Sequence, residues 1–167
     1  MKQLVLFDIN KELCDEWNKL FKDEKNVKII NTSFKELQYE YVVTAGNSYG
    51  WMTGGIDLAV RNYYGIEIQD LIQNIIIGKF SGQLPVGESI LINTYDKNKK
   101  NLIYAPTMRY PMKIKAIDIY YVFYKLLIKY DNFACCGLGA ATGGLSNKEC
   151  AKIMYKAYID YINYYKN

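Results

Sequence analysis

The sequence of 167 residues contains no histidine. This absence excludes serine–histidine–aspartate triads, cysteine–histidine nucleophilic pairs and most zinc sites, because each of these depends on an imidazole. Arginine occurs only at Arg61 and Arg109, and proline only three times. With so little proline and no serine- and proline-rich stretch, no linker divides the chain. We therefore expect one domain over residues 1–167.

The four cysteines form no disulfide or zinc pattern. Cys14, Cys135, Cys136 and Cys150 include no Cys-x-x-Cys pair, and a bond between the two vicinal residues would close a strained ring. The apolar run near the N-terminus is too short for a signal peptide, and no run reaches membrane-spanning length. These features predict free thiols in a reducing, intracellular compartment, the cytoplasm, and no contact with a membrane.

Charge is nearly balanced, with 21 basic and 17 acidic residues and a formal net charge of +4. A nucleic-acid-binding protein usually gathers its basic residues on one face or in one run. The densest cluster here is Lys97, Lys99 and Lys100, which we interpret as a solvated turn between strands. We therefore expect no strong nucleic-acid binding, although the mild positive excess is compatible with a small anionic ligand.

Short apolar runs alternate with segments of helical periodicity, which predicts an α/β domain of three layers. Asn10 and Ser146 are the expected N-caps of the first and last helices. In the helix over residues 112–129, the spacing places five residues on one apolar face: Ile114, Ile117, Tyr121, Tyr124 and Ile128. We expect strands at residues 4–7, 27–30, 41–43, 89–93, 102–105 and 133–136, and helices at 10–25, 55–64, 67–77, 112–129 and 147–164.

Glycine placement is the most informative feature of the sequence. Eight of the twelve glycines fall in two short segments, residues 46–55 and 137–144, and each segment follows an apolar strand and precedes a helix. In an open α/β sheet, such junctions lie at the carboxyl edge, where ligands bind. Glycine permits close approach of the backbone, and a helix N-terminus offers unpaired N–H groups. Two adjacent segments of this kind suit a diphosphate flanked by sugars, whereas one alone is typical of an ordinary turn.

Two common nucleotide-binding motifs are absent. Neither glycine-rich segment has the lysine that the P-loop pattern GxxxxGK[ST] requires, and no GxGxxG follows the first strand. The sequence therefore excludes a P-loop nucleotidase and a Rossmann dinucleotide-binding domain.

At this level of detail the chain resembles a known family. Residues 42–57, VVTAGNSYGWMTGGID, resemble the first ligand loop of macro domains, and residues 137–144, GLGAATGG, resemble the second loop, which wraps the diphosphate. The similarity covers essentially the whole chain. The sequence of the first loop and the segment APTMR at residues 105–109 most resemble a divergent branch of the family found among phage and viral proteins.

The resemblance implies a macro-domain-like α/β/α fold with a central mixed, mostly parallel sheet between helices. It also implies binding of ADP-ribose, or of an ADP-ribosylated macromolecule, without a cofactor or a metal. The ligand would contact main-chain N–H groups in both loops. The implied contact residues are Gly54, Gly55, Ile56 and Asp57 in the first loop, and Gly137, Leu138, Gly139, Ala140, Ala141, Thr142 and Gly143 in the second.

The family commonly places an aspartate near the exit of the second strand, where it binds the adenine amino group. The matching stretch here, residues 30–33, contains no acid, so Thr32 or Ser33 would accept that hydrogen bond instead. A hydroxyl accepts more weakly than a carboxylate, and weaker selection for adenine follows.

Some macro domains hydrolyse ADP-ribosyl bonds or remove a phosphate from the distal ribose. The resemblance makes Asn47 the residue that contacts the distal ribose, although an asparagine there can also brace its own loop as an Asx-turn. Asp57 acts either as a base that orients water or as an acid that complements the helix dipole. One hydrolase branch of the family uses a lysine early in the helix after the first loop and an aspartate in the second loop. This chain does not match that branch, because Arg61 stands at the lysine position and the second loop has no acid.

Arg109 follows a strand at the expected ligand edge, where it would either grip a phosphate or pair with a surface carboxylate. Tyr49 and Trp51 would cover the ligand or only pack the loop. Three functions remain open: a binding module, a hydrolase of ADP-ribosyl adducts or of ADP-ribose phosphate, and a macro-like interaction module that has lost its ligand. Glycines in both loops favour a retained site, because packing alone is not expected to require them.

Overall fold

The computed structural model describes residues 3–165, whose six strands form one sheet in the order β2-β1-β6-β3-β5-β4. All neighbouring strands run parallel except β4, which is antiparallel to β5. The sheet is therefore mixed and mostly parallel, as predicted. The strands are β1 (Leu4–Asp8), β2 (Val27–Asn31), β3 (Tyr41–Asn47), β4 (Ile90–Ile92), β5 (Asn101–Met108) and β6 (Phe133–Cys136).

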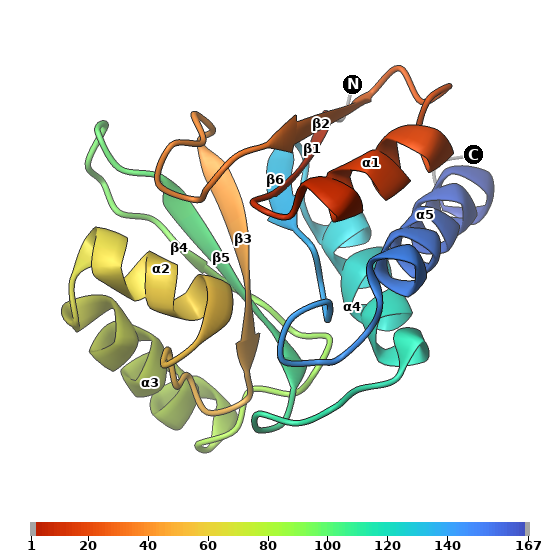
Figure 1. The fold of residues 1–167 in the computed structure, drawn as a ribbon. Coiled ribbons are helices and arrows are strands. Elements are labelled where there is room, and N and C mark those ends of the chain that lie inside the picture. Colours follow the sequence, from red (N-terminus) through yellow and green to blue (C-terminus); the bar gives the residue numbers. More distant parts are fainter. Residues whose placement is uncertain (1–2, 166–167) are drawn as a thin grey trace.

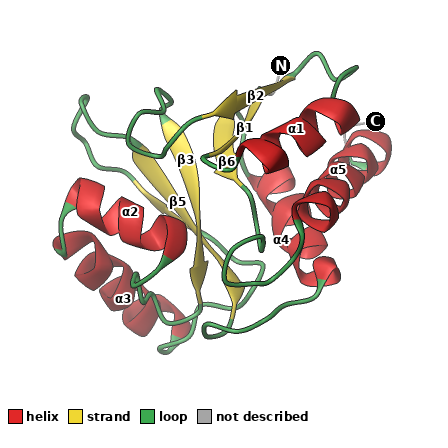
Figure 2. Cartoon of the chain, viewed as in Figure 1, coloured by secondary structure: helices red, strands yellow, loops and turns green. Residues whose placement is uncertain are grey.

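Helices cover both faces of the sheet and complete an α/β/α arrangement (Figure 1 and Figure 2). On one face α5 packs between α1 and α4, and on the other α2 lies against β3 with α3 beside it. The helices are α1 (Lys11–Leu20), α2 (Gly55–Tyr64), α3 (Glu67–Phe80), α4 (Ala116–Lys129) and α5 (Asn147–Tyr164).

Both predicted N-caps are confirmed. The Asn10 side chain accepts hydrogen bonds from the N–H groups of Glu12 and Leu13 at the start of α1. Ser146 and Glu149 exchange side-chain to backbone hydrogen bonds at the start of α5. These contacts satisfy donors that the first turn of a helix leaves without intrahelical partners. The first helix ends at Leu20, earlier than predicted, because tight turns lead the chain into β2.

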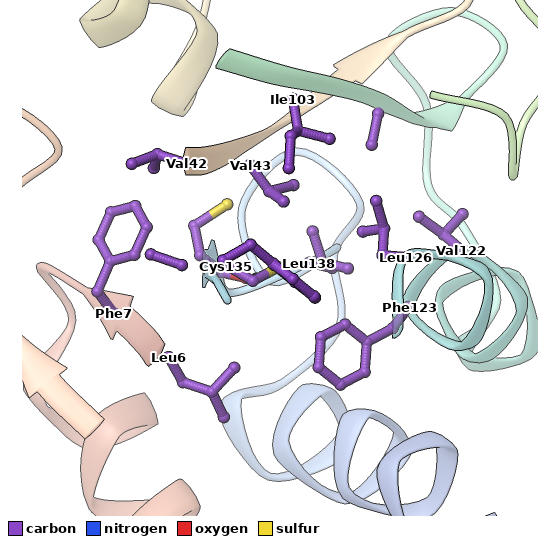
Figure 3. Close-up of a cluster of buried hydrophobic side chains, with 14 of the residues drawn as sticks. Leu6, Phe7, Val42, Val43, Ile103, Val122, Phe123, Leu126, Cys135 and Leu138 are labelled. Carbon is purple, nitrogen blue, oxygen red and sulfur yellow. The ribbon is translucent and has the colours of Figure 1, made fainter. Parts of the chain in front are cut away.

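The core lies between the sheet and both helical layers. Figure 3 shows Leu6 of β1, Val43 of β3 and Phe123 of α4 gathered around Cys135 of β6. The central strands are buried on both faces, which explains their nearly continuous apolar sequence. The four cysteines are buried free thiols. No helix within residues 3–165 has the length and the apolar character needed to cross a membrane.

The predicted apolar face of the fourth helix was right for Ile114, Tyr124 and Ile128, which are partly buried against the core, and wrong for the other two residues. Ile117 and Tyr121 are 47% and 58% exposed, whereas Ile119, Val122 and Phe123 are buried. Apolar residues occur all around this helix, so the periodicity did not distinguish the face that packs on the protein from the face that meets water.

The prediction of a solvated turn was wrong for one of its three lysines. Lys97 and Lys99 are exposed, but Lys100 is only 7% exposed. Its ammonium lies 4.3 Å from the centroid of the Tyr63 ring and 5.2 Å from that of Phe34. Two lysines of the turn are therefore exposed to solvent, and the third is buried against two aromatic rings.

Candidate functional site

The two glycine-rich segments meet at one edge of the sheet. Strands β3 and β6 are parallel neighbours, so the chain leaves both at the same end. We call residues 48–54, between β3 and α2, loop 1, and residues 137–145, between β6 and α5, loop 2. A cleft of about 170 Å³ separates them, and Gly54 and Gly139 line it together. The shared pocket expected from the sequence is therefore present.

Ten of the predicted contact residues line this cleft. The remaining lining residues come from the end of β3, from loop 1, from the end of β5 and from the segment that follows β5. The predicted residues are Asn47, Gly54, Gly55, Ile56, Asp57, Gly137, Gly139, Ala141, Thr142 and Gly143; the others are Ala45, Gly46, Trp51, Thr53, Thr107, Met108 and Pro111.

Asn47, the last residue of β3, holds loop 1 in place through its side chain. Its Oδ1 accepts hydrogen bonds from the backbone N–H groups of Tyr49 and Trp51 at 3.1 and 3.2 Å, and its Nδ2 donates to the Trp51 carbonyl at 2.8 Å. This is the Asx-turn role that the sequence left open. Because Asn47 also lines the cleft, contact with a ribose stays a prediction for the same side chain.

Tyr104 holds the backbone of Asn47 and was missed by the sequence analysis. Its hydroxyl donates to the Asn47 carbonyl at 2.7 Å and accepts from the Asn47 N–H at 3.0 Å. This happens where the β3–β5 pairing shifts register between Gly46 and Asn47. A Cβ on Gly46 would lie 2.3 Å from the Tyr104 ring, so glycine is required there. Only the register of β3 against β5 brings these residues together.

Asp57 is buried in the first turn of α2 and is 4% exposed, yet it lines the cleft. The Thr44 hydroxyl donates to its Oδ1 at 2.7 Å. Burial raises the pKa of Asp57 to about 7, and the hydrogen bond from Thr44 opposes that rise. A surface acid that only complements the helix dipole would not be buried in this way. The carboxyl can instead gain or lose a proton near neutral pH.

The start of α2 offers unpaired donors to the cleft. Gly54 is the N-cap and makes no side-chain cap hydrogen bond, so the N–H groups of the first turn have no capping oxygen. Gly55 has a φ of +55°, which accounts for glycine there. Gly54 has an extended φ of −155°, and a Cβ on it would meet nothing within 4 Å. Nothing within the described protein requires glycine at residue 54.

Glycine is required in loop 2 by the protein's own packing and backbone conformation. A Cβ on Gly137 would lie 2.3 Å from Leu13, and a Cβ on Gly143 would lie 2.7 Å from the Gly139 carbonyl oxygen. Gly139 itself has a φ of +79°. The expectation that packing would not require the glycines was therefore wrong for loop 2, and it was also wrong for Gly46 beside the Tyr104 ring. The N-terminus of α5 also differs from that of α2, because a capping box engages the N–H groups of Ser146 and Glu149.

Five predicted contact residues lie outside the lining of the cleft that residues 3–165 form: Thr32, Ser33, Arg109, Leu138 and Ala140. The Ser33 hydroxyl is hydrogen-bonded to the backbone and side chain of Glu36 in a local turn. The Thr32 N–H donates to the Asp8 carbonyl, which fixes the start of this segment at the end of β1. Leu138 is fully buried and packs in the core (Figure 3).

Arg109 contacts Tyr49 of loop 1, and Tyr49 in turn contacts Trp51. The Arg109 Nε donates to the Tyr49 hydroxyl at 3.3 Å, and the rings of Tyr49 and Trp51 stack with centroids 5.1 Å apart. Trp51 is 45% exposed and lines the cleft, so it both packs its loop and faces the pocket. The arginine thus uses a tyrosine hydroxyl, not a surface carboxylate, as its partner.

The missed lining residues of β5 follow from the length of that strand. The sequence predicted a strand ending at Ala105, but β5 continues to Met108 and carries Thr107 and Met108 to the edge where β3 ends. Within residues 3–165, no group of histidine, cysteine, aspartate and glutamate side chains is arranged to hold a metal ion.

Comparison with known proteins identifies the fold. The macrodomain of Mycobacterium tuberculosis DarG superposes with a TM-score of 0.66 at 20% identity, over 77% of this chain and 87% of that one. A point mutant of the Oceanobacillus iheyensis macrodomain with ADPR gives 0.67 at 16% identity, over 80% and 76%. Thermosipho africanus DarTG in complex with ADP-ribose gives 0.63 at 15% identity, over 92% of this chain and 49% of that one.

Sequence comparison agrees with the structural likeness. An uncharacterized protein of Aquifex aeolicus (strain VF5) is 23% identical over 136 residues, which is 77% of this chain and 78% of that protein. The family model for the Macro domain matches residues 43–154, more than half of the chain and the part that includes both loops. This chain therefore belongs to the macro domain family.

Proposed function

We propose that the chain binds ADP-ribose, or a macromolecule that carries it, in the cleft between loop 1 and loop 2. Membership of the macro domain family supports this proposal, as do the similar structures from O. iheyensis, with ADPR, and from T. africanus, in complex with ADP-ribose. The single observation that carries it is Gly54, an N-cap without a side chain, without a capping hydrogen bond and with open space in front of it.

The first turn of α2 is the proposed diphosphate site. Unpaired N–H groups and the positive end of the helix dipole attract an anion, and an N-cap side chain would compete for the same donors. A ligand lying against the backbone accounts for glycine at residue 54, where the fold itself gives no reason for it. Loop 2 would close the opposite wall through Gly139, Ala141, Thr142 and Gly143, with Asn47 placed to meet the distal ribose.

The open cleft argues against the loss of ligand binding. An interaction module that had lost its ligand would be expected to fill the pocket with side chains, whereas about 170 Å³ stays empty between the loops. Isothermal titration calorimetry with ADP-ribose at neutral pH tests the proposal. Saturable binding supports it, and no detectable binding at millimolar ligand would end it.

Hydrolysis is a second candidate function, and Asp57 favours it. A carboxyl that lines the cleft with a pKa of about 7 can accept a proton from a water molecule that attacks the ribose carbon of an ADP-ribosyl bond, or the phosphorus of a phosphate on the distal ribose. The leaving group then takes up a proton from the Asp57 carboxyl group or from solvent, which returns Asp57 to the carboxylate. The Thr44 hydroxyl would hold the carboxylate in place.

Asp57→Asn separates hydrolysis from binding. If Asp57 is the base, the variant keeps its affinity for ADP-ribose but loses product release from ADP-ribosylated substrates and from ADP-ribose phosphate. Asn47→Ala is a less specific test, because Asn47 also holds loop 1 together. Absence of turnover in the unaltered protein, or full turnover in Asp57→Asn, would remove the catalytic role.

A further inference from the structure

A second hollow lies at the other end of the sheet. It has a volume of about 320 Å³ and is formed by residues 35–40, which lead into β3, and residues 97–100, which lead into β5. Because β3 and β5 are parallel, their amino ends lie at the edge opposite the ADP-ribose cleft. Figure 1 shows both segments at the ends of β3 and β5 that are remote from loop 1.

Lys100 is buried in this hollow without a carboxylate partner. Its side chain lies over the rings of Tyr63 and Phe34, and its Nζ donates to the Lys35 carbonyl at 3.4 Å. None of the ion pairs found among residues 3–165 includes it. The groups that contact this ammonium are therefore two aromatic faces and one carbonyl, and none of them carries a negative charge.

Three further lysines surround the same hollow. Lys35, Lys97 and Lys99 are exposed and line it with Lys100, and Glu40 is the one acid in the lining. The lining therefore carries an excess of positive charge, with four lysines and one glutamate, and like charges that share one hollow repel one another. A bound anion would remove this repulsion and neutralise the buried ammonium.

We propose that this hollow is a second anion site, which takes a small ligand with two or more clustered phosphate charges. Lysine ammonium groups act as flexible point charges with three donors each, which suits phosphate oxygens. The hollow has a volume of only about 320 Å³, with Tyr63 in its lining, so it fits a compact polyphosphate better than an extended strand of nucleic acid. The site is separate from the ADP-ribose cleft and does not depend on it.

Nuclear magnetic resonance with inorganic pyrophosphate tests the proposal on the full chain. Amide signals of residues 35–40 and 97–100 are expected to shift and saturate, whereas any shift at residues 54–57 reports the ADP-ribose cleft and is read separately. The double variant Lys97→Gln, Lys99→Gln should weaken the shifts at the hollow about tenfold or more, because two charge-assisted contacts are lost. Both side chains are exposed, so the fold should persist.

The matched control is Lys79→Gln, Lys152→Gln, which removes the same charge from exposed positions outside the hollow. It should leave pyrophosphate affinity at residues 97–100 within about twofold of the original. Lys100→Met should abolish binding at the hollow and leave any shifts at residues 54–57 unchanged. Equal weakening by both double variants, no saturable shift at the hollow, or shifts there with a single-stranded oligonucleotide but not with pyrophosphate would overturn the proposal.

Discussion

Replacing Gly54 with serine adds a side chain where the protein leaves open space at the mouth of the cleft. The extended backbone of residue 54 accepts any side chain, and a Cβ there meets nothing within 4 Å. A serine hydroxyl at this N-cap can accept a hydrogen bond from an N–H group of the first turn of α2. The same donors are the ones that we propose a diphosphate uses.

The expected effects on stability and binding have opposite signs. The new cap contributes a few tenths of a kcal/mol and the reduced freedom of the unfolded chain about 0.4–1 kcal/mol, so stability should rise by about 1 kcal/mol and Tm by about 2–4 °C. Loss of one charge-assisted hydrogen bond costs about 1.5–3 kcal/mol of binding free energy. ADP-ribose should therefore bind about ten- to a hundredfold more weakly.

Thermal unfolding and calorimetry with ADP-ribose measure the two effects on one protein preparation. The control is Gly78→Ala in α3, where a Cβ also meets nothing within 4 Å and where alanine favours the helix by about 1 kcal/mol. It should raise Tm without any change in affinity. Unchanged affinity in Gly54→Ser would refute the diphosphate site at α2, and a lower Tm would refute the uncapped helix start.

Three further changes test the supports of the cleft. Gly46→Ala should lower stability by about 2–3 kcal/mol, seen as a fall in Tm, because the new Cβ overlaps the Tyr104 ring; an unchanged Tm would show that the ring moves freely. Tyr104→Phe removes the hydroxyl that bonds the Asn47 N–H and leaves the Asn47 carbonyl with only the Gly50 N–H at 3.3 Å, which should cost about 1–3 kcal/mol in urea unfolding. If its ADP-ribose affinity is retained, Tyr104 has no part in shaping loop 1. Asp57 has a folded pKa of about 7, above the ordinary 3.8, so its contribution to stability is fully present below about pH 4 and is lost as pH rises towards 7. Asp57→Asn removes this titration, and its amide oxygen can still accept a hydrogen bond from Thr44. In urea unfolding, the free energy of unfolding of the variant should therefore rise relative to that of the original protein between about pH 4 and pH 8, by up to about 4 kcal/mol. Parallel pH profiles for the two proteins would contradict the burial argument.

Local features of the fold could be predicted because their causes lie within a few residues. Asn10 and Ser146 cap helices through atoms two or three residues away. The alternation of apolar runs and helical segments predicted the strands of the sheet, and the glycine-rich segments after two of them predicted a shared cleft. The glycine spacing indicated a diphosphate flanked by sugars, and the family resemblance narrowed that expectation to ADP-ribose.

Predictions failed where a residue's role depends on what packs against it. Lys100 was placed in water, because the sequence does not show that Phe34 and Tyr63 cover it. The exposed and buried faces of α4 could not be distinguished, since both are apolar. Tyr104 was not singled out from the sequence, because the pairing of β3 with β5 brings its hydroxyl to the backbone of Asn47, 57 residues away.

The amino-acid sequence by itself determined the order of strands and helices, the N-caps and the positions of the two glycine-rich segments, since hydrophobic periodicity and capping act over short distances along the chain. Only the tertiary structure decided which of those glycines face open space and which face packed side chains, and it alone gave Asp57 a buried environment. Both outcomes depend on side chains that are far apart in sequence, and their contacts are set by how the helices pack on the sheet.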